Sequence, residues 1–271
     1  MADDSLADFE AGTFTHDGRT RTVYQTGSGP AVIVLAELPG ITPRVAGFAR
    51  RVAGIGATAV VPHLFGVPGR DPAARGRLGA ARYGMTSFAS VCISREFNLW
   101  AGGRTSPVVD WLRALAGDEH TRCGGPGVGA VGMCFTGGFA LAMATHPSIV
   151  APVVAEPSLP LPFTPARRRS IDCSPAELDV VRDRCAAEGL QVLGTRFKGD
   201  RISPPERFQF LRERLGDSFV AVELDDSAAN PDAMMRPHSV LTEHLIDSPG
   251  QPTRAALDQV LDLFRTRLQL A

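Results

Sequence analysis

At residues 132–138 the sequence reads GMCFTGG, and this stretch stands where a predicted buried strand ends and a predicted helix begins. A sharp turn of this kind presents its central side chain at the edge of a sheet, and the small Gly132 two positions earlier lets strand and helix approach closely. The spacing matches the nucleophile elbow G-x-S-x-G, with Cys134 in place of serine. The free N–H groups that begin the helix would favour a thiolate there. From position alone, the alternative is that Cys134 is one more small buried side chain.

Predicted strands and helices alternate on both sides of this stretch. Buried strands are expected at 31–36, 57–61, 127–131, 149–155, 190–195 and 219–224, and helices at 43–55, 98–116, 135–145, 175–187, 205–215 and 255–268. Two short runs around Asp17-Gly18 predict a hairpin before the first of them. The alternation predicts an α/β fold with a mostly parallel central sheet flanked by helices. We expect one domain over residues 1–271, with an irregular excursion near 65–95 where Gly, Pro and Arg are frequent.

Composition excludes several classes of protein. The 28 basic and 29 acidic side chains leave a formal charge of −1, so no overall field favours nucleic acid or an anionic membrane. No run approaches the roughly 20 apolar residues that span a bilayer, and the acidic start lacks the pattern of a secretory signal. The five cysteines form no CxxC pair, which argues against a disulfide framework and a structural zinc site. We expect a cytoplasmic enzyme. Lys198 is the one lysine of the chain, while Arg, Ala and Gly are frequent, and this composition is typical of GC-rich bacterial genes.

Two further residues follow Cys134 in the chain order that elbow enzymes use, which is nucleophile, acid, histidine. Asp200 comes after the predicted strand at 190–195, and His238 lies in the loop after the strand at 219–224. Both positions belong to the carboxyl edge, where open α/β sheets build their sites. Glu156 is a rival for the acid, since it follows the strand at 149–155. His244 is a rival for the histidine, and we interpret it as a surface or supporting residue.

The chain resembles the dienelactone hydrolases, a family of the α/β-hydrolase superfamily with a cysteine nucleophile. The resemblance covers about residues 13–268 and rests on Glu37-Leu38-Pro39-Gly40, Gly132-Met133-Cys134-Phe135, Gly199-Asp200 with Pro204, and Pro237-His238-Ser239. It implies the α/β-hydrolase fold and a Cys–His–Asp triad that hydrolyses esters and lactones of small molecules.

Residue by residue, the resemblance implies a triad of Cys134, His238 and Asp200, with Glu37 in contact with the resting cysteine. The backbone N–H groups of Phe135 and Leu38 are the expected oxyanion donors.

Three positions bear on how far the resemblance extends to the substrate. Arg95 is a candidate substrate-binding residue. The chain departs from the family at Thr136, where glycine is usual, and at Thr242, where the archetype has an arginine.

We predict neither a cofactor nor a metal. Residues 127–132 read as G-x-G-x-x-G, but these glycines lead through a strand instead of opening a helix, as a dinucleotide site requires. No histidine pair has the HExxH spacing, and none stands beside a cysteine pair. The expected partner is therefore a small-molecule ester or lactone, while the oligomeric state stays open.

Two functional hypotheses follow. The first is a carboxylic ester hydrolase that works through a thioester acyl-enzyme on Cys134. The second is a non-hydrolytic thiol redox sensor, or a small-molecule binding protein, on the same fold. The order of Cys134, Asp200 and His238 favours hydrolysis, because a sensor needs neither the acid nor the oxyanion donors.

Overall fold

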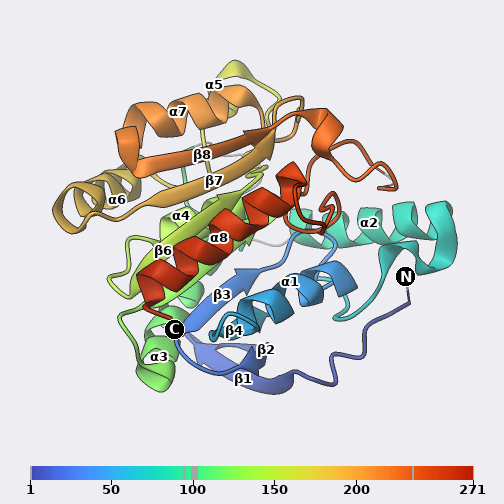
Figure 1. Cartoon of the computed structure of the whole chain (residues 1–271), viewed down its shortest axis with the longest axis horizontal. Coiled ribbons are helices and arrows are strands. Elements are labelled where there is room, and N and C mark those ends of the chain that lie inside the picture. Colours follow the sequence, from blue (N-terminus) through green and yellow to red (C-terminus); the bar gives the residue numbers. More distant parts are fainter. Residues whose placement is uncertain (1, 94–95, 99–102, 234, 271) are drawn as a thin grey trace.

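A central eight-stranded sheet forms the middle layer of the computed structural model, which describes residues 2–93, 96–98, 103–233 and 235–270 (Figure 1). The strands are β1 (Glu10–His16), β2 (Arg19–Gly27), β3 (Ala31–Leu35), β4 (Thr58–Pro62), β5 (Val128–Met133), β6 (Ile149–Ala155), β7 (Val192–Phe197) and β8 (Phe219–Leu224). Their spatial order is β1-β2-β4-β3-β5-β6-β7-β8. β2 runs antiparallel to β1 and β4, while the neighbours from β4 to β8 run parallel. The predicted α/β class with a mostly parallel sheet is confirmed.

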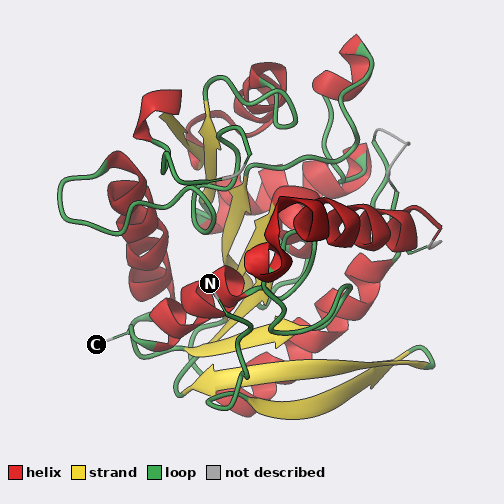
Figure 2. Cartoon of the chain, turned by 90° about the vertical axis from the view of Figure 1, so that its right-hand side faces the viewer, coloured by secondary structure: helices red, strands yellow, loops and turns green. Residues whose placement is uncertain are grey.

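Helices cover both faces of the sheet (Figures 1 and 2). In the described residues the α-helices are α1 (Pro43–Ala53), α2 (Gly76–Ile93), α3 (Val108–Cys123), α4 (Gly137–Met143), α5 (Pro165–Arg168), α6 (Pro175–Glu188), α7 (Pro205–Leu215) and α8 (Pro252–Leu268). Short 3₁₀ turns are η1 (Pro72–Arg75), η2 (Cys134–Thr136), η3 (Gly216–Ser218) and η4 (Asp226–Ala228). The buried side chains of α1 and α8 pack on one face, and those of α3, α4, α6 and α7 pack on the other.

Strand β3 shows why its sequence is apolar throughout. Ile33 and Leu35 belong to the core beneath α3 and α4, whereas Val32 and Val34 belong to the core beneath α1 and α8. All four side chains are fully buried. A strand covered on both faces has no solvent side, so it reads as a continuous hydrophobic run instead of an alternating one.

The predicted hairpin is also confirmed. β1 and β2 are joined by Asp17 and Gly18, both with positive φ (48° and 72°). Positive φ at both central residues matches the twist of a two-residue hairpin, and Asp-Gly tolerates it well. The hairpin forms one end of the sheet (Figure 2).

Two sequence-based expectations are wrong in detail. The predicted irregular excursion near 65–95 contains the 18-residue helix α2, because residues 77–93 hold no proline and many helix-forming side chains. Of the helix expected over residues 98–116, residue 98 and residues 103–107 are not helical, and α3 begins at Val108; residues 99–102 lie outside the described part of the chain. Pro107 disfavours helical backbone before it, and Ser106 Oγ instead accepts a hydrogen bond from the backbone N–H of Asn98 at 2.8 Å.

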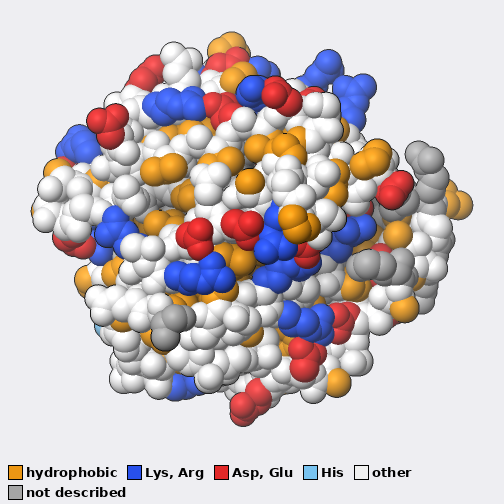
Figure 3. Space-filling model, viewed as in Figure 1, with side chains coloured by type: hydrophobic (Ala, Val, Ile, Leu, Met, Phe, Trp, Pro, Cys, Tyr) orange, Lys and Arg blue, Asp and Glu red, His pale blue; other side chains and the backbone are white. Residues whose placement is uncertain are grey.

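Acidic and basic side chains are interspersed on the face covered by α1 and α8 (Figure 3), consistent with the small net charge. Within the part of the chain that the structure describes, no helix combines the length and the apolar character needed to cross a membrane.

Candidate active site

The carboxyl edge of the parallel sheet gathers the predicted site residues. Glu37 follows β3, Cys134 follows β5, Glu156 follows β6 and Asp200 follows β7, while His238 lies in the loop beyond β8. These strands are consecutive neighbours in the sheet, so residues separated by up to 201 positions meet at one edge. This is the edge at which open α/β sheets place their ligands.

The turn after β5 has the geometry of a nucleophile elbow. Cys134 has a φ of +51°, a left-handed backbone that a cysteine adopts only under constraint. A Cβ atom at Gly132 would lie 2.1 Å from the carbonyl oxygen of Thr136, and one at Gly137 would lie 2.7 Å from Cα of Pro157. Both positions therefore require glycine. Cys134 itself is half-buried, unlike the fully buried side chains around it.

Thr136 contributes to this turn in a way that sequence reasoning missed. Its side chain is fully buried, and Oγ1 accepts a hydrogen bond from the backbone N–H of Met133 at 3.0 Å. The hydroxyl donates toward the carbonyl of Leu35, the last residue of β3, also at 3.0 Å. One hydroxyl thus ties the elbow to the neighbouring strand that leads to Glu37.

Asp200 and His238 form the closest polar pair of the site. The distance between His238 Nδ1 and Asp200 Oδ2 is 2.6 Å, and both side chains are almost fully buried. The other oxygen, Oδ1, accepts hydrogen bonds from the backbone N–H groups of Ile202 (2.8 Å) and Ser203 (3.2 Å). Three groups therefore converge on Asp200, and its contact with Nδ1 fixes the orientation of the imidazole ring.

The free side of the His238 ring faces Cys134. Nε2 is buried without a regular hydrogen bond among the described residues. Burial would lower the pKa of His238, but the negative charge of Cys134 and the contact with Asp200 outweigh burial and raise the pKa well above its usual value. The structure thus sets the charged form of His238 against the side chain of Cys134.

Ser158 is a neighbour of Cys134 that sequence reasoning missed. Its Oγ lies 3.6 Å from Sγ of Cys134, and its backbone N–H donates to the Cys134 carbonyl at 2.9 Å. Ser158 follows Glu156-Pro157 in the turn after β6 and belongs to no motif of its own, so no sequence pattern pointed to the contact.

Of the two roles expected for His244, a surface residue or a supporting one, the first is wrong, because its side chain is buried. Its Nδ1 accepts hydrogen bonds from the backbone N–H groups of His238 (3.4 Å) and Ser239 (3.2 Å), and Nε2 lies 3.1 Å from the Met235 carbonyl. Burial lowers the pKa of His244. A neutral ring with these contacts holds the loop that carries His238.

Glu37 is paired differently from the resemblance-based expectation. Its carboxylate accepts hydrogen bonds from the hydroxyls of Ser239 and Thr242. Thr242, one of the two departures from the family pattern, thus has a definite contact. In the described residues the thiol hydrogen bond of Cys134 goes to Ser158 instead, so the role of Glu37 as partner of the resting cysteine stays a prediction.

Glu156 is a second buried acid beside the histidine. Its side chain is fully inaccessible and its φ is +34°. Thr195 Oγ1 donates to Oε2 at 3.3 Å, while Oε1 is buried without a partner among the described residues. Burial raises the pKa of Glu156 well above its usual value, although the nearby His238 partly opposes this.

The remaining predicted residues concern the oxyanion and the substrate. Phe135 stands in the first turn after the elbow, where backbone N–H groups have no intrahelical acceptor. Leu38 follows Glu37 and lines a cavity of about 490 Å³ that also contacts Ser239. Arg95 lies outside the described residues.

The sheet order, the strained elbow and the histidine–carboxylate pair together define an α/β hydrolase. A model of the dienelactone hydrolase family matches residues 19–164, which is more than half of the chain. The chain belongs to the dienelactone hydrolase family. Membership supports a hydrolase of the ester or lactone type. No curated protein sequence gives a significant match.

Solved structures of similar fold come from several sources. An α/β hydrolase from Penicillium sp. sh18 has a TM-score of 0.62 at 14% identity, with 97% of this chain and 99% of that chain covered. A dienelactone hydrolase-like promiscuous phosphotriesterase from metagenomic libraries has a TM-score of 0.56 at 16% identity (94% and 98% covered). A cold-adapted esterase from an Arctic intertidal metagenomic library has a TM-score of 0.54 at 14% identity (99% and 98% covered). At these identities the likeness establishes the fold alone.

Proposed function

We propose that this protein hydrolyses an ester or lactone bond of a small molecule through Cys134, His238 and Asp200. The observation that carries the proposal is the buried 2.6 Å contact between Asp200 and His238 at the same sheet edge as the strained Cys134. A buried acid fixes one imidazole nitrogen, and the other nitrogen is left to exchange a proton with the nucleophile.

In the first half-reaction, the Cys134 thiolate attacks the carbonyl carbon and gives a tetrahedral oxyanion. The backbone N–H groups of Phe135 and Leu38 stabilise the developing charge; losing one such donor typically slows catalysis by about 10²–10³. The carbon–oxygen bond of the ester then breaks. His238 gives its proton to the departing alcohol, and the acyl group stays on Cys134 as a thioester.

In the second half-reaction, neutral His238 takes a proton from water, and the resulting hydroxide attacks the thioester carbonyl. Collapse of this intermediate breaks the carbon–sulfur bond, releases the carboxylic acid and restores the thiolate–imidazolium pair. Asp200 keeps the imidazole in the required tautomer throughout and does not itself become protonated.

The nucleophile is tested by chemical labelling. We expect iodoacetamide at neutral pH to modify Cys134 before the other cysteines whose side chains the structure describes. Burial raises the pKa of the Cys123, Cys173 and Cys185 thiols, which lowers their thiolate fraction. Peptide mapping over a time course gives the order. Modification of any of these three before Cys134 would contradict the assignment.

The reaction itself is tested with p-nitrophenyl esters and simple lactones. Wild-type protein should turn them over, and Cys134→Ala should reduce the rate to the background of the reagent. Cys185→Ala is the matched control, since it removes a thiol remote from the elbow and should keep the activity. Reversible oxidation of Cys134 without turnover of any ester or lactone would favour the thiol sensor instead.

A further inference from the structure

The cavity of about 490 Å³ lies beside the catalytic residues and has a distinctive lining. Glu37, Leu38 and Ser239 bring it to the site, the last being the neighbour of His238. Much of its remaining wall is apolar. These apolar side chains belong to the segment before α1 and its first turn, to the η1–α2 segment and to the loop before His238. Examples are Pro39, Pro43, Pro72, Ala73, Ala80 and Met235. Part of a substrate held at the oxyanion donors would extend into this space.

The charged groups of the cavity are mainly acidic. Three carboxyl groups line it, those of Glu37, Asp71 and Glu243, against one guanidinium among the described lining residues, that of Arg44. Arg44 Nε binds Glu243 Oε2 at 2.7 Å, with each side chain about one-third exposed. The one cation in the wall is therefore already neutralised by a carboxylate.

Burial raises the pKa of Glu243, and the charges of Glu37 and Asp71 act in the same direction, while Arg44 and His244 oppose them. These residues are thus close enough to share one electrostatic field. A carboxylate entering the cavity would lose water and meet this negative field, and the described lining offers only Arg44, which is already paired, to compensate.

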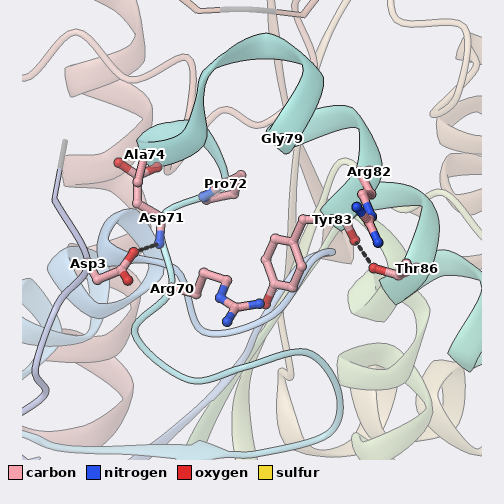
Figure 4. Close-up of a pocket in the computed structure, with 9 residues that line it drawn as sticks. All are labelled: Asp3, Arg70, Asp71, Pro72, Ala74, Gly79, Arg82, Tyr83 and Thr86. Carbon is pink, nitrogen blue, oxygen red and sulfur yellow. Dashed lines mark hydrogen bonds between the residues drawn. The ribbon is translucent and has the colours of Figure 1, made fainter.

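A second cavity, of about 370 Å³, lies next to the first and provides a contrast (Figure 4). It is lined by Arg70 and Arg82, and the Arg70 guanidinium lies 5.1 Å from the ring centre of Tyr83. Asp71 lines both cavities, but Glu37, Leu38 and Ser239, which bring the first cavity to the site, do not line the second one. Its arginines therefore do not supply a carboxylate-binding group at the catalytic edge.

We propose that the first cavity receives an uncharged, largely apolar part of the substrate, and that the Arg44–Glu243 pair makes the site discriminate against a carboxylate at that position. This inference rests on the proposed hydrolase function. It assigns a substrate class, neutral esters or lactones, and a specificity residue, Glu243.

Two pairs of esters that differ by one charge test the proposal. p-Nitrophenyl valerate and mono-p-nitrophenyl glutarate exchange a terminal methyl for a carboxylate on the acyl side; butyl acetate and 4-acetoxybutanoate do so on the alcohol side. We expect wild-type kcat/KM to favour the neutral ester by about tenfold or more in at least one pair. Equal or faster turnover of the anionic ester in both pairs would overturn the proposal.

Glu243→Gln then tests the specificity residue. The substitution removes one negative charge and releases Arg44, so the neutral-to-anionic ratio of kcat/KM should fall several-fold in the discriminating pair. Glu213→Gln is the matched control, because Glu213 pairs with Arg169 at 2.6 Å and both side chains are about half exposed. It should leave the ratio unchanged. Equal ratios in the two variants would exclude the Arg44–Glu243 pair as the cause.

The proposal can fail separately from the proposed function. If esters are turned over but without charge preference, only the cavity assignment is wrong. If no ester is turned over, the hydrolase proposal fails, and ligand-observed NMR of Cys134→Ala with methyl valerate and monomethyl glutarate decides the cavity assignment. Preferential binding of methyl valerate would support an apolar, anion-rejecting cavity, and equal binding would overturn it.

Discussion

The turns after β6 and β7 place two carboxyl groups at the same sheet edge, but they surround them very differently. Asp200, after β7, receives two backbone N–H groups and the imidazole of His238. Glu156, after β6, receives one hydroxyl at 3.3 Å and keeps one oxygen without a partner among the described residues. Both side chains are buried, so burial does not distinguish them.

The difference teaches that hydrogen-bond donors, and not position along the sheet, distinguish the surroundings of the two acids. A buried carboxylate is stable only when hydrogen bonds replace its hydration, and three donors do this for Asp200. Glu156 has fewer such contacts, and burial raises its pKa well above the usual value. Its surroundings favour the protonated form, whereas Asp200 is the acid in contact with the imidazole.

The largest expected effect comes from Asp200→Asn. The amide cannot hold the imidazole in the correct tautomer, so we expect kcat to fall by about 10⁴ while the fold is kept. Ester hydrolysis with circular dichroism as a check on folding measures this. Asp217→Asn is the control, since this exposed residue precedes β8 at the opposite edge of the sheet.

Glu156→Gln sharpens the same comparison, because an amide closely mimics a neutral carboxylic acid. We expect the variant to retain most of the activity. If Glu156→Gln did not hydrolyse esters and Asp200→Asn kept the wild-type rate, the triad acid would be Glu156 and not Asp200.

The pH dependence of stability gives a smaller effect with a definite sign. Glu156 keeps its proton in the native state, whereas in the unfolded chain it ionises near the ordinary glutamate pKa of 4.5. Above that pH, unfolding releases a proton, so this residue lowers the free energy of unfolding increasingly as pH rises toward its native pKa.

Glutamine carries no such proton. The stability of Glu156→Gln relative to wild type should therefore increase from about pH 5 to pH 8, by at most about 1.4 kcal/mol per pH unit. Urea denaturation at several pH values measures this, with Glu213→Gln as a variant expected to show no such trend. Parallel curves for Glu156→Gln and wild type would show that Glu156 is ionised in the native state.

The smallest expected effect concerns Ser158, in the same turn as Glu156. Its hydroxyl accepts the hydrogen bond of the Cys134 thiol at 3.6 Å. When Cys134 is ionised, the same hydroxyl can turn and donate to the sulfur. Ser158→Ala removes a hydrogen bond worth about 1 kcal/mol, so labelling of Cys134 at neutral pH should slow by about fivefold. The rate of iodoacetamide modification against pH measures this. An unchanged profile would mean that Ser158 only packs against the elbow.

Most of the architecture could be predicted from the sequence because its signals are local. The apolar run at residues 31–36 predicts a doubly covered strand, and β3 is one. Asp17-Gly18 predicts a hairpin, since only a few residue types accept positive φ at both central positions. The spacing from Gly132 to Cys134 predicts the elbow, because Gly132 has no room for a side chain.

What only the tertiary structure decided is which groups meet across the sheet edge. Ser158 reaches Cys134, Thr242 reaches Glu37, and Arg44 pairs with Glu243 across some 200 positions, through contacts that no local spacing encodes. These contacts depend on the order of strands in the sheet and on where each loop turns back. The sequence by itself determined the candidate acids and the elbow. The arrangement of donors in three dimensions decided that Asp200 contacts the imidazole, while Glu156 is buried with one oxygen unpartnered among the described residues.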